Sequence, residues 1–362
     1  MFRFFRLLCW TAFGFPYVLV AQPSSDAAFS DEAPLQLIRE QCEVFPEGTQ
    51  LAMAFLNEGK VHFMGFQRMG DSLVEIDNRT AVFEVGSITK VFTSTLLAQA
   101  VGAEQVQLDQ DIRTLGLEKL WVKDSISLLN LANHSSGLPR MPSDIFLTPN
   151  IDHQNPFKGY TGEILEAYLA EKVHLDHPPG EQYAYSNLGA GLLGYLLAKQ
   201  ADMNYPELLQ RQIFDPIGMK NSGCERADFP DQVVPALGVT GDTVPHWDWQ
   251  SLAGAGVILS TVEDLGKFVK QHFEQEDAAL NLTREPTLRV SPKLNIGLGW
   301  HIIRGKDNRE VHWHNGGTAG FSSHLSMDME TEQAVIILSN VSAYHPKMRR
   351  IDQMGFRLLK RL

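Results

Sequence analysis

The order of apolar and polar positions divides this chain into strand-like ends and a helix-like middle. Strand patterns cover Gln50–Leu56 and Val61–Gln67, and the segment between them is Asn57-Glu58-Gly59. Asn and Gly tolerate positive φ, so this arrangement predicts a β-hairpin. Strand patterns return at 297–304, 309–313, 322–329 and 333–338, and a final helix follows. We therefore expect strands from both ends of the chain to form one sheet.

Helical periods dominate the rest of the chain. One helix is expected over 31–45, with Leu35, Leu37, Ile38 and Val44 toward one face, and another from Ser87 to about Val101. From about 108 to 285, helical periods alternate with Pro/Gly turns. We expect an α/β (α+β) fold: a three-layer sandwich with an antiparallel sheet from about 30–107 and 286–362, and an inserted, mainly helical subdomain over 108–285.

Candidate chemistry begins at the helix predicted to start at Ser87. Ser87-Ile88-Thr89-Lys90 places a hydroxyl and an amine three residues apart, on one helical face. A serine hydroxyl is a weak nucleophile at neutral pH, and a neighbouring amine together with the positive end of a helix dipole can activate it. Taken alone, this spacing also fits a surface serine beside a solvated lysine, so the interpretation depends on partners elsewhere in the chain.

Two further motifs follow in order. Tyr185-Ser186-Asn187 comes after a Pro178-Pro179-Gly180 turn and opens an apolar run from Leu188 to Leu197. His314-Asn315-Gly316-Gly317 follows the strand-like stretch 309–313.

The order and approximate spacing of these motifs resemble those of the serine β-lactamases and penicillin-binding proteins, whose signature is S-x-x-K, then S-x-N or Y-x-N, then K-T-G. With a tyrosine at the start of the second motif, the chain resembles the class C β-lactamases in particular. The similarity extends to five segments and covers most of the chain from about residue 50: FEVGSITKVF (83–92), LANHSSGLP (131–139), YAYSNLGAGLLG (183–194), FDPIGMK (214–220) and GAGVILSTVEDL (254–265). His314 departs from the family pattern, because the best-known members carry lysine there.

The resemblance implies roles for the motif residues. Ser87 would attack a carbonyl carbon and form an acyl-enzyme, and its proton would pass to Lys90 and Tyr185 together. Nearby cations, Lys90 and a protonated His314, would favour the phenolate of Tyr185. Asn187 would hydrogen-bond Lys90 and the substrate amide.

The last motif is expected to shape the oxyanion hole. In the family this hole uses backbone N–H groups, here those of Ser87 and Gly317, while Gly316, Gly317 and Thr318 would border the substrate. Because histidine titrates near 6.5 whereas lysine stays charged, His314 predicts a steeper dependence of activity on pH.

Other chemistries have less support in the sequence. His134 is similar to a histidine that supports a loop in the family. His312 and His314 face the same way on a strand and form a possible metal pair, but no further cluster or H-E-x-x-H helix completes it. The α/β-hydrolase elbow G-x-S-x-G is absent, because Val85 and Thr89 occupy its glycine positions. We expect no metal and no cofactor.

Composition and charge restrict the partners. The 362 residues, 44% hydrophobic and 20% charged, are ordinary for a globular protein, and a net charge of −12 argues against nucleic acid. The C-terminal segment is the exception, with Lys347, Arg349, Arg350, Arg357, Lys360 and Arg361 beside apolar residues. A basic amphipathic helix can bind membrane surfaces, but a helix packed on the sheet with its cations in water is the favoured interpretation.

The N-terminus predicts a secretory signal. Arg3 and Arg6 precede an apolar run from Leu7 to Val20, and Ala21 precedes a polar segment, so residues 1–21 would be cleaved near Ala21 to release a catalytic domain of residues 22–362. The alternative is an uncleaved anchor. A periplasmic or secreted location would permit a disulfide between Cys42 and Cys224, which the sequence leaves open.

The expected function is that of a secreted serine hydrolase acting on amide or ester bonds, with three substrates open: a β-lactam, a D-Ala-D-Ala cell-wall peptide, or a carboxyl ester. His314 in place of lysine weakens carboxylate recognition and leans toward an esterase or an altered peptidase. The alternative from another class is a non-catalytic penicillin-binding sensor, against which the intact Ser87, Lys90 and Tyr185 argue.

Overall fold

A computed structural model describes residue 29 and residues 32–147, 151–274, 277–305 and 309–362. The predicted secretory signal at 1–21 lies outside the described residues. In the described part of the chain, no helix has the length and apolar character needed to cross a membrane.

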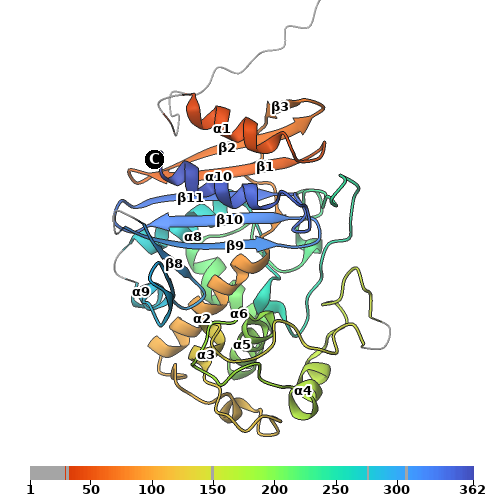
Figure 1. The fold of residues 1–362 in the computed structure, drawn as a ribbon, viewed down its shortest axis with the longest axis vertical. Helices are drawn as coiled ribbons and strands as arrows, with labels where there is room; N and C mark the ends of the chain where they lie inside the picture. The colour runs from red at the N-terminus through yellow and green to blue at the C-terminus, as the bar shows by residue number, and fades with distance from the viewer. Residues whose placement is uncertain (1–28, 30–31, 148–150, 275–276, 306–308) are drawn as a thin grey trace, which may run out of the picture.

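One nine-stranded sheet forms the centre of the molecule, and each neighbouring pair of its strands is antiparallel (Figure 1). Its order is β3-β2-β1-β11-β10-β9-β8-β7-β6, so the N-terminal strand β1 pairs directly with the C-terminal strand β11. The strands are β1 (Gln50–Asn57), β2 (Lys60–Met69), β3 (Ser72–Glu75), β6 (Leu288–Ser291), β7 (Leu294–Ile296), β8 (His301–Arg304), β9 (Glu310–Gly317), β10 (Ser322–Asp328) and β11 (Gln333–Ser339). The predicted sheet from both ends of the chain is confirmed.

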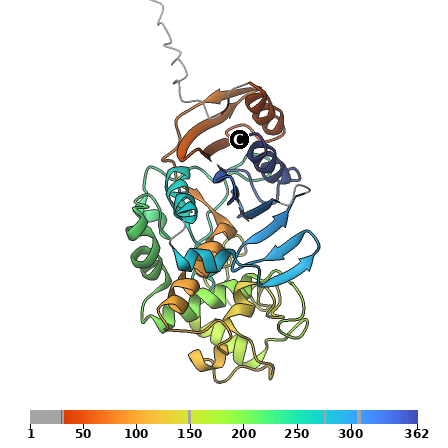
Figure 2. The same cartoon turned by 90° about the vertical axis from the view of Figure 1, so that its left-hand side faces the viewer.

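The alternation within β1 shows how the sheet is covered on both faces. Leu51, Met53 and Phe55 pack with α1 (Ala33–Cys42) and α10 (Arg349–Leu359), whereas Ala52 and Ala54 face the larger core on the other side. Successive side chains of a strand point to opposite faces, so a strand that is apolar throughout must be buried on both. Figure 2 shows α1 and α10 together on one side of the sheet and α8 (Val262–Phe273) on the other.

The middle of the chain is mainly helical, as predicted. Its helices are α3 (Leu128–Ala132), α4 (Gly162–Glu171), α5 (Asn187–Gln200), α6 (Tyr205–Leu209), α7 (Asp215–Ile217), α8 and α9 (Ala278–Arg284). The boundary expected near 285 does not match the packing, because α8 contacts β1 and β11 and so belongs with the sheet. The pattern also missed β3, β6 and β7, and the short pair β4 (Phe83–Glu84) and β5 (Leu259–Ser260), since strands of two to four residues carry little periodicity.

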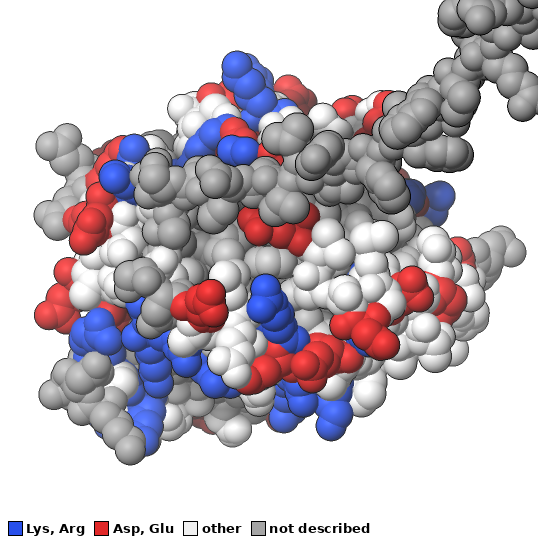
Figure 3. All heavy atoms as spheres, turned by 90° about the horizontal axis from the view of Figure 1, so that it is seen from above, with Lys and Arg blue, Asp and Glu red and all other residues white. Residues whose placement is uncertain are grey.

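The C-terminal helix packs as the favoured interpretation expected. Ile351, Met354 and Leu358 are buried against the sheet, while Arg357 and Lys360 remain exposed. Figure 3 looks down on this end of the molecule and shows positive and negative side chains both present, with a positive group at the lower left.

The two cysteines are separate in the structure. Cys42 is buried among the residues of α1, whereas Cys224 lies against the other core, and both are free. Burial raises the pKa of the Cys42 thiol to about 12, so the thiol stays protonated and packs as a small apolar group.

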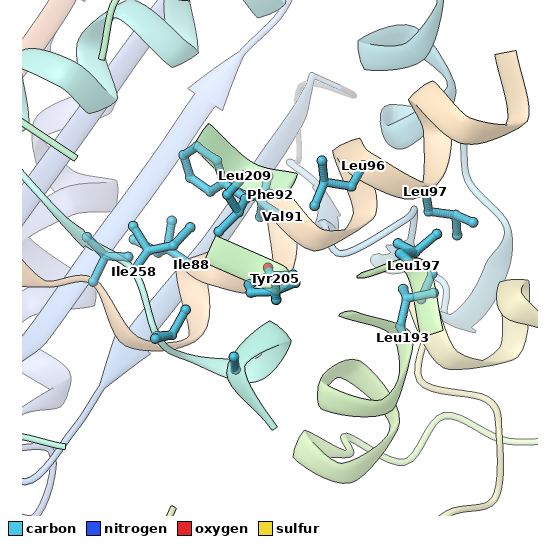
Figure 4. Packing of buried hydrophobic residues seen from close by; sticks show 14 of the residues in the cluster. Ile88, Val91, Phe92, Leu96, Leu97, Leu193, Leu197, Tyr205, Leu209 and Ile258 are labelled. Atoms are coloured by element: carbon cyan, nitrogen blue, oxygen red, sulfur yellow. The ribbon is translucent and has the colours of Figure 1, made fainter. Parts of the chain in front are cut away.

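Helix α2 (Thr89–Gly102) passes through the main core directly after the serine. Figure 4 shows Val91, Phe92 and Leu96 of α2 among Leu193 and Leu197 of α5 and other core residues. Residues 89–98 of this helix are all buried, polar side chains included, so the helix is enclosed by protein on every side over this stretch.

Phe92 provides a test of how much this packing contributes. Its ring is fully buried and stacked on Phe268 of α8, with the centroids 4.1 Å apart. Phe92→Ala leaves a cavity between α2 and α8, so we expect the free energy of unfolding to fall by about 3–5 kcal/mol, measured by urea denaturation. Leu147→Ala, at a side chain that is 79% exposed, is the control and should change it by less than about 0.5 kcal/mol. Equal effects of the two substitutions would contradict the role given to Phe92.

Candidate active site

Ser87 lies at the start of α2, on the wall of a cavity of about 820 Å³. The chain reaches it from β4 through Gly86, whose φ is +54°, and a short 3₁₀ turn over Gly86–Ile88. A Cβ on Gly86 would lie 2.6 Å from the backbone nitrogen of Gly317. Glycine is therefore required at 86 both by the positive φ and by the close approach of β9.

Lys90 is buried directly behind the serine. Its Nζ lies 2.9 Å from Ser87 Oγ and donates to the carbonyl oxygen of Ala255 at 2.7 Å, and the side chain is 2% exposed. Burial lowers the pKa of Lys90 well below its usual value, and the nearby charge of Arg140 lowers it further. A neutral amine has a lone pair for the hydroxyl proton, so this environment suits Lys90 to act as a base.

Tyr185 completes the group around Ser87. It immediately precedes Ser186, which caps α5 by accepting from the N–H of Gly189 at 2.9 Å. Lys90 Nζ lies 4.9 Å from the centre of the tyrosine ring. Burial raises the pKa of Tyr185, more than the hydrogen bond with Ser87 and the charge of Arg140 lower it. The expectation that nearby cations would favour the phenolate is therefore wrong for this structure, because loss of hydration outweighs them.

Asn187 lines the same cavity but does not make the predicted contact with Lys90. The hydrogen bond of its Nδ2 goes to Met141 Sδ at 3.4 Å, and Lys90 Nζ is bonded to Ser87 and Ala255 instead. The neighbouring loop at Arg140–Met141 thus holds the Asn187 side chain beside the cavity.

His314 is fully buried on β9 and differs from the expectation for a titrating group. Its Nδ1 lies 2.6 Å from the carbonyl oxygen of Asn315, so Nδ1 carries a proton, and its Nε2 is buried without a hydrogen-bond partner among the described residues. Burial lowers the pKa of His314 well below 6.5, helped by the charges of His301 and Lys90. Burial therefore disfavours the protonated His314 expected from the sequence, since that expectation assumed a solvated imidazole, and the steeper pH dependence near 6.5 stays a prediction that a pH profile of activity measures.

The glycines of β9 lie against the serine turn. A Cβ on Gly316 would lie 1.9 Å from the carbonyl oxygen of Val85 and 2.9 Å from the backbone nitrogen of Ser87. Gly317 lines the cavity. Thr318 does not match its expected place beside the substrate: it is fully buried in the turn after β9, where its N–H donates to the carbonyl of Phe321.

The other histidines surround this group without forming a metal cluster among the described residues. His134 Nδ1 accepts from the N–H of Ser186 at 3.2 Å, which fits the supporting role expected for it. His312 Nε2 lies 3.3 Å from the carbonyl oxygen of Arg284. Tyr183 hydroxyl and His301 Nε2 are 2.9 Å apart, and burial lowers the pKa of His301 to about 4.

Helix α10 holds β9 from the opposite face of the sheet. Asn315 and His324 are cross-strand neighbours, and both contact Asp352: Asn315 Nδ2 donates to it at 2.8 Å, and His324 Nδ1 lies 3.0 Å away. This network fixes the strand that carries His314 and Gly317.

Sequence reasoning missed Arg140 and the aromatic wall of the cavity. Arg140 directly follows the LANHSSGLP segment, so its position next to a matched segment was the available signal. Phe157 and Trp249 are stacked with their ring centroids 3.8 Å apart, and both line the cavity with Trp247. These three come from loops, where no periodicity marks a binding surface.

Comparison with known proteins agrees with this architecture. Residues 50–355 match the family model described as "Beta-lactamase". The chain is 28% identical over 268 residues to the D-alanyl-D-alanine-carboxypeptidase/endopeptidase AmpH of Escherichia coli K12, covering 68% of each protein. It is 23% identical over 349 residues to a beta-lactamase of the same organism, covering 83% of this chain and 86% of that one. A class C beta-lactamase structure from Rhodobacter sphaeroides superposes with a TM-score of 0.75 at 17% identity, covering 91% of this chain and 100% of that one.

Proposed function

Because the chain belongs to the beta-lactamase family and is a serine hydrolase of that fold, we propose that it hydrolyses amide bonds of the β-lactam or D-Ala-D-Ala peptide type through an acyl-enzyme on Ser87. The observation that supports this proposal is the cavity-lining hydroxyl of Ser87, whose Oγ lies 2.9 Å from Lys90 Nζ, which in turn lies 4.9 Å from the centre of the Tyr185 ring.

The protonation states suggest the course of acylation. Ser87 donates its hydroxyl proton to the neutral amine of Lys90 as Oγ bonds to the substrate carbonyl carbon. The N–H groups of Ser87 and Gly317 stabilise the oxyanion. The proton then passes from Lys90, by way of the neutral hydroxyl of Tyr185, to the leaving nitrogen as the amide bond breaks. Water then attacks the carbonyl carbon of the acyl-enzyme, and its proton passes through Tyr185 to Lys90. The ester bond to Oγ breaks, Lys90 returns the proton to Oγ, and the carboxylic acid product leaves.

A carboxylesterase is the second candidate, and His314 favours it. The family's best-known members place a lysine cation at this position, whereas the buried imidazole here is neutral. A neutral group at this point removes one fixed charge that would favour anionic peptides or β-lactams over simple esters.

Intact-mass spectrometry of wild type and Ser87→Ala after brief incubation with a fluorescent penicillin tests the proposal, together with turnover of nitrocefin and of p-nitrophenyl butyrate. A stable adduct lost in the variant indicates a penicillin-binding peptidase, and Ser87-dependent nitrocefin turnover without an adduct indicates a β-lactamase. Ser87-dependent ester turnover alone favours the esterase. No Ser87-dependent signal in any of these assays contradicts the proposal and favours the non-catalytic sensor.

Secretion is proposed from the N-terminal sequence, with Arg3 and Arg6 before the apolar run that ends near Ala21. We expect the protein, expressed at full length in a bacterium, to be recovered from the periplasm or medium with an N-terminus near Gln22. Edman sequencing or peptide mapping of the purified protein measures this. Recovery of the intact Met1 terminus in the membrane fraction would instead support an uncleaved anchor.

A further inference from the structure

Arg140 contributes a positive charge to the wall of the cavity, next to Ser87 and Asn187. Among the described residues that line this cavity, Arg140 is the only lysine or arginine. Its backbone carbonyl accepts from the N–H of Asn187 at 2.9 Å, which fixes its main chain to the start of α5. The side chain is exposed, so the guanidinium is open to a ligand in the cavity.

The guanidinium is held over an aromatic ring and not by a carboxylate. Its carbon lies 5.0 Å from the centre of the Tyr185 ring, a cation–π distance. Within the described ranges no aspartate or glutamate forms an ion pair with it, in contrast to Arg226, which pairs with Asp248 at 2.7 Å. Among the described residues that line the cavity, Asp242 is the only acidic one. Its carboxylate accepts a hydrogen bond from Thr240 Oγ1 at 2.5 Å.

An arginine in this setting is suited to a planar anion. A guanidinium presents a rigid fork of N–H donors that matches a carboxylate in a bidentate manner, and stacking on a ring pre-organises it. Burial lowers the pKa of His314, so His314 offers no such charge, and Arg140 is the Lys or Arg side chain in the described lining that can hold an anion.

We infer that Arg140 binds the carboxylate of an anionic substrate, which makes it a specificity-determining residue of this hydrolase. This inference rests on the proposed function and names its substrate class: a carboxylate-bearing amide or ester whose apolar part packs against Phe157, Trp247 and Trp249.

A bound carboxylate has a second consequence at Lys90. The charge of Arg140 lowers the pKa of Lys90, second only to burial. A substrate carboxylate that neutralises this charge raises the pKa of Lys90 toward its usual value. The acidic limb of the pH profile of kcat, which reports on the substrate-bound enzyme, should therefore lie at higher pH for a carboxylate-bearing substrate than for a neutral one.

The test compares matched substrates, because the carboxylate can be on either side of the bond that is cleaved. p-Nitrophenyl hemisuccinate and p-nitrophenyl butyrate place or omit a carboxylate on the acyl side. An N-acyl-D-alanyl-D-lactate and its methyl ester do so on the leaving group. We expect wild type to have a higher kcat/KM for the charged member of one pair than for its uncharged member. Arg140→Gln should reduce this ratio of kcat/KM, charged over uncharged, at least ten-fold, and Arg140→Lys should recover part of it.

Lys158→Gln is the matched control for a general loss of positive charge. Lys158 pairs with Asp248 at 3.3 Å, its side chain is 65% exposed, and it does not line the cavity. The ratio of kcat/KM for the charged over the uncharged substrate should remain within two-fold of the wild-type ratio in this variant.

Three results would overturn the inference: no preference for either charged substrate, an unchanged ratio in Arg140→Gln, or an equal fall in Lys158→Gln. Should Arg140→Gln not fold, competitive inhibition of wild type provides a second measurement. Phenylacetate must then inhibit more strongly than phenylacetamide, and equal inhibition contradicts the inference. If no substrate is hydrolysed in a Ser87-dependent manner, the proposed function itself fails. Ser87-dependent hydrolysis with a ratio insensitive to Arg140 refutes this inference alone.

Discussion

Ser87→Ala is expected to lower kcat/KM by about 10⁴-fold or more for any substrate that wild type hydrolyses through the acyl-enzyme. The Ser87 hydroxyl lies on the cavity wall, 2.9 Å from Lys90 Nζ, and that nitrogen lies 4.9 Å from the centre of the Tyr185 ring. Its removal leaves those two side chains with no nucleophile to activate. The measurement is steady-state hydrolysis of the best substrate from the panel above, with the variant assayed at high protein concentration.

A loss of structure must be separated from this loss of chemistry. Ser222→Ala is a suitable control, because Ser222 is buried and its Oγ lies 2.8 Å from Ser260 Oγ, but it does not line the cavity. Its kcat/KM should stay near that of wild type. Retention of more than about a hundredth of wild-type activity by Ser87→Ala would exclude Ser87 as the nucleophile, since such residues typically contribute far more.

Lys90→Arg is expected to lower kcat/KM by about 10³-fold, although it preserves a long basic side chain. The role proposed for Lys90 requires a neutral amine, and a guanidinium is not deprotonated in proteins. Lys90→Met should lose activity to a similar degree, because it also lacks a proton acceptor. Lys267→Arg is the matched control: Lys267 pairs with Asp264 at 2.6 Å outside the cavity, where a permanent charge is tolerated.

The pH profile of wild type tests the same role. Burial and Arg140 lower the pKa of Lys90, so the neutral, active form dominates above that pKa and is lost as the pH falls through it. Activity should thus rise with pH along one acidic limb. His314 should add no second step near 6.5, because burial lowers its pKa well below that value. Activity that declines as the pH rises from 5 to 8 would contradict a neutral Lys90 as the base.

Strand β1 shows how much of the fold can be predicted from the sequence. Residues 51–56 are apolar throughout, and a strand buried on both faces needs helices above and below it, which α1 and α10 on one side and α8 on the other provide. The hairpin at Asn57-Glu58-Gly59 was equally predictable, and Gly59 adopts the positive φ expected of it, but the second positive φ falls on Glu58 and not on Asn57. The position of α8 was not, since its amphipathic pattern shows that it has an apolar face but not which layer covers that face.

The candidate site divides in the same way. The three-residue spacing of Ser87 and Lys90 places both on one side of the first helical turns, a local consequence of helix geometry. The likeness of three ordered motifs added Tyr185, Asn187 and His314 as neighbours before any coordinates. The contact of Asn187 with Met141 depends on a side-chain rotamer set by a loop 46 residues away in sequence, and local patterns do not specify it.

By itself, the sequence determined the sheet built from both ends and the helical middle, because periodicity and turn chemistry are local properties of the chain, and the resemblance of its three motifs to a known family indicated the residues that meet around Ser87. Only the tertiary structure decided how their pKa values shift: downward at Lys90 and His314 and upward at Tyr185. Burial causes these shifts, and burial depends on which distant segments cover each group. For the same reason, Arg140 emerged as a candidate binding residue only when α5 and the cavity wall were brought beside it.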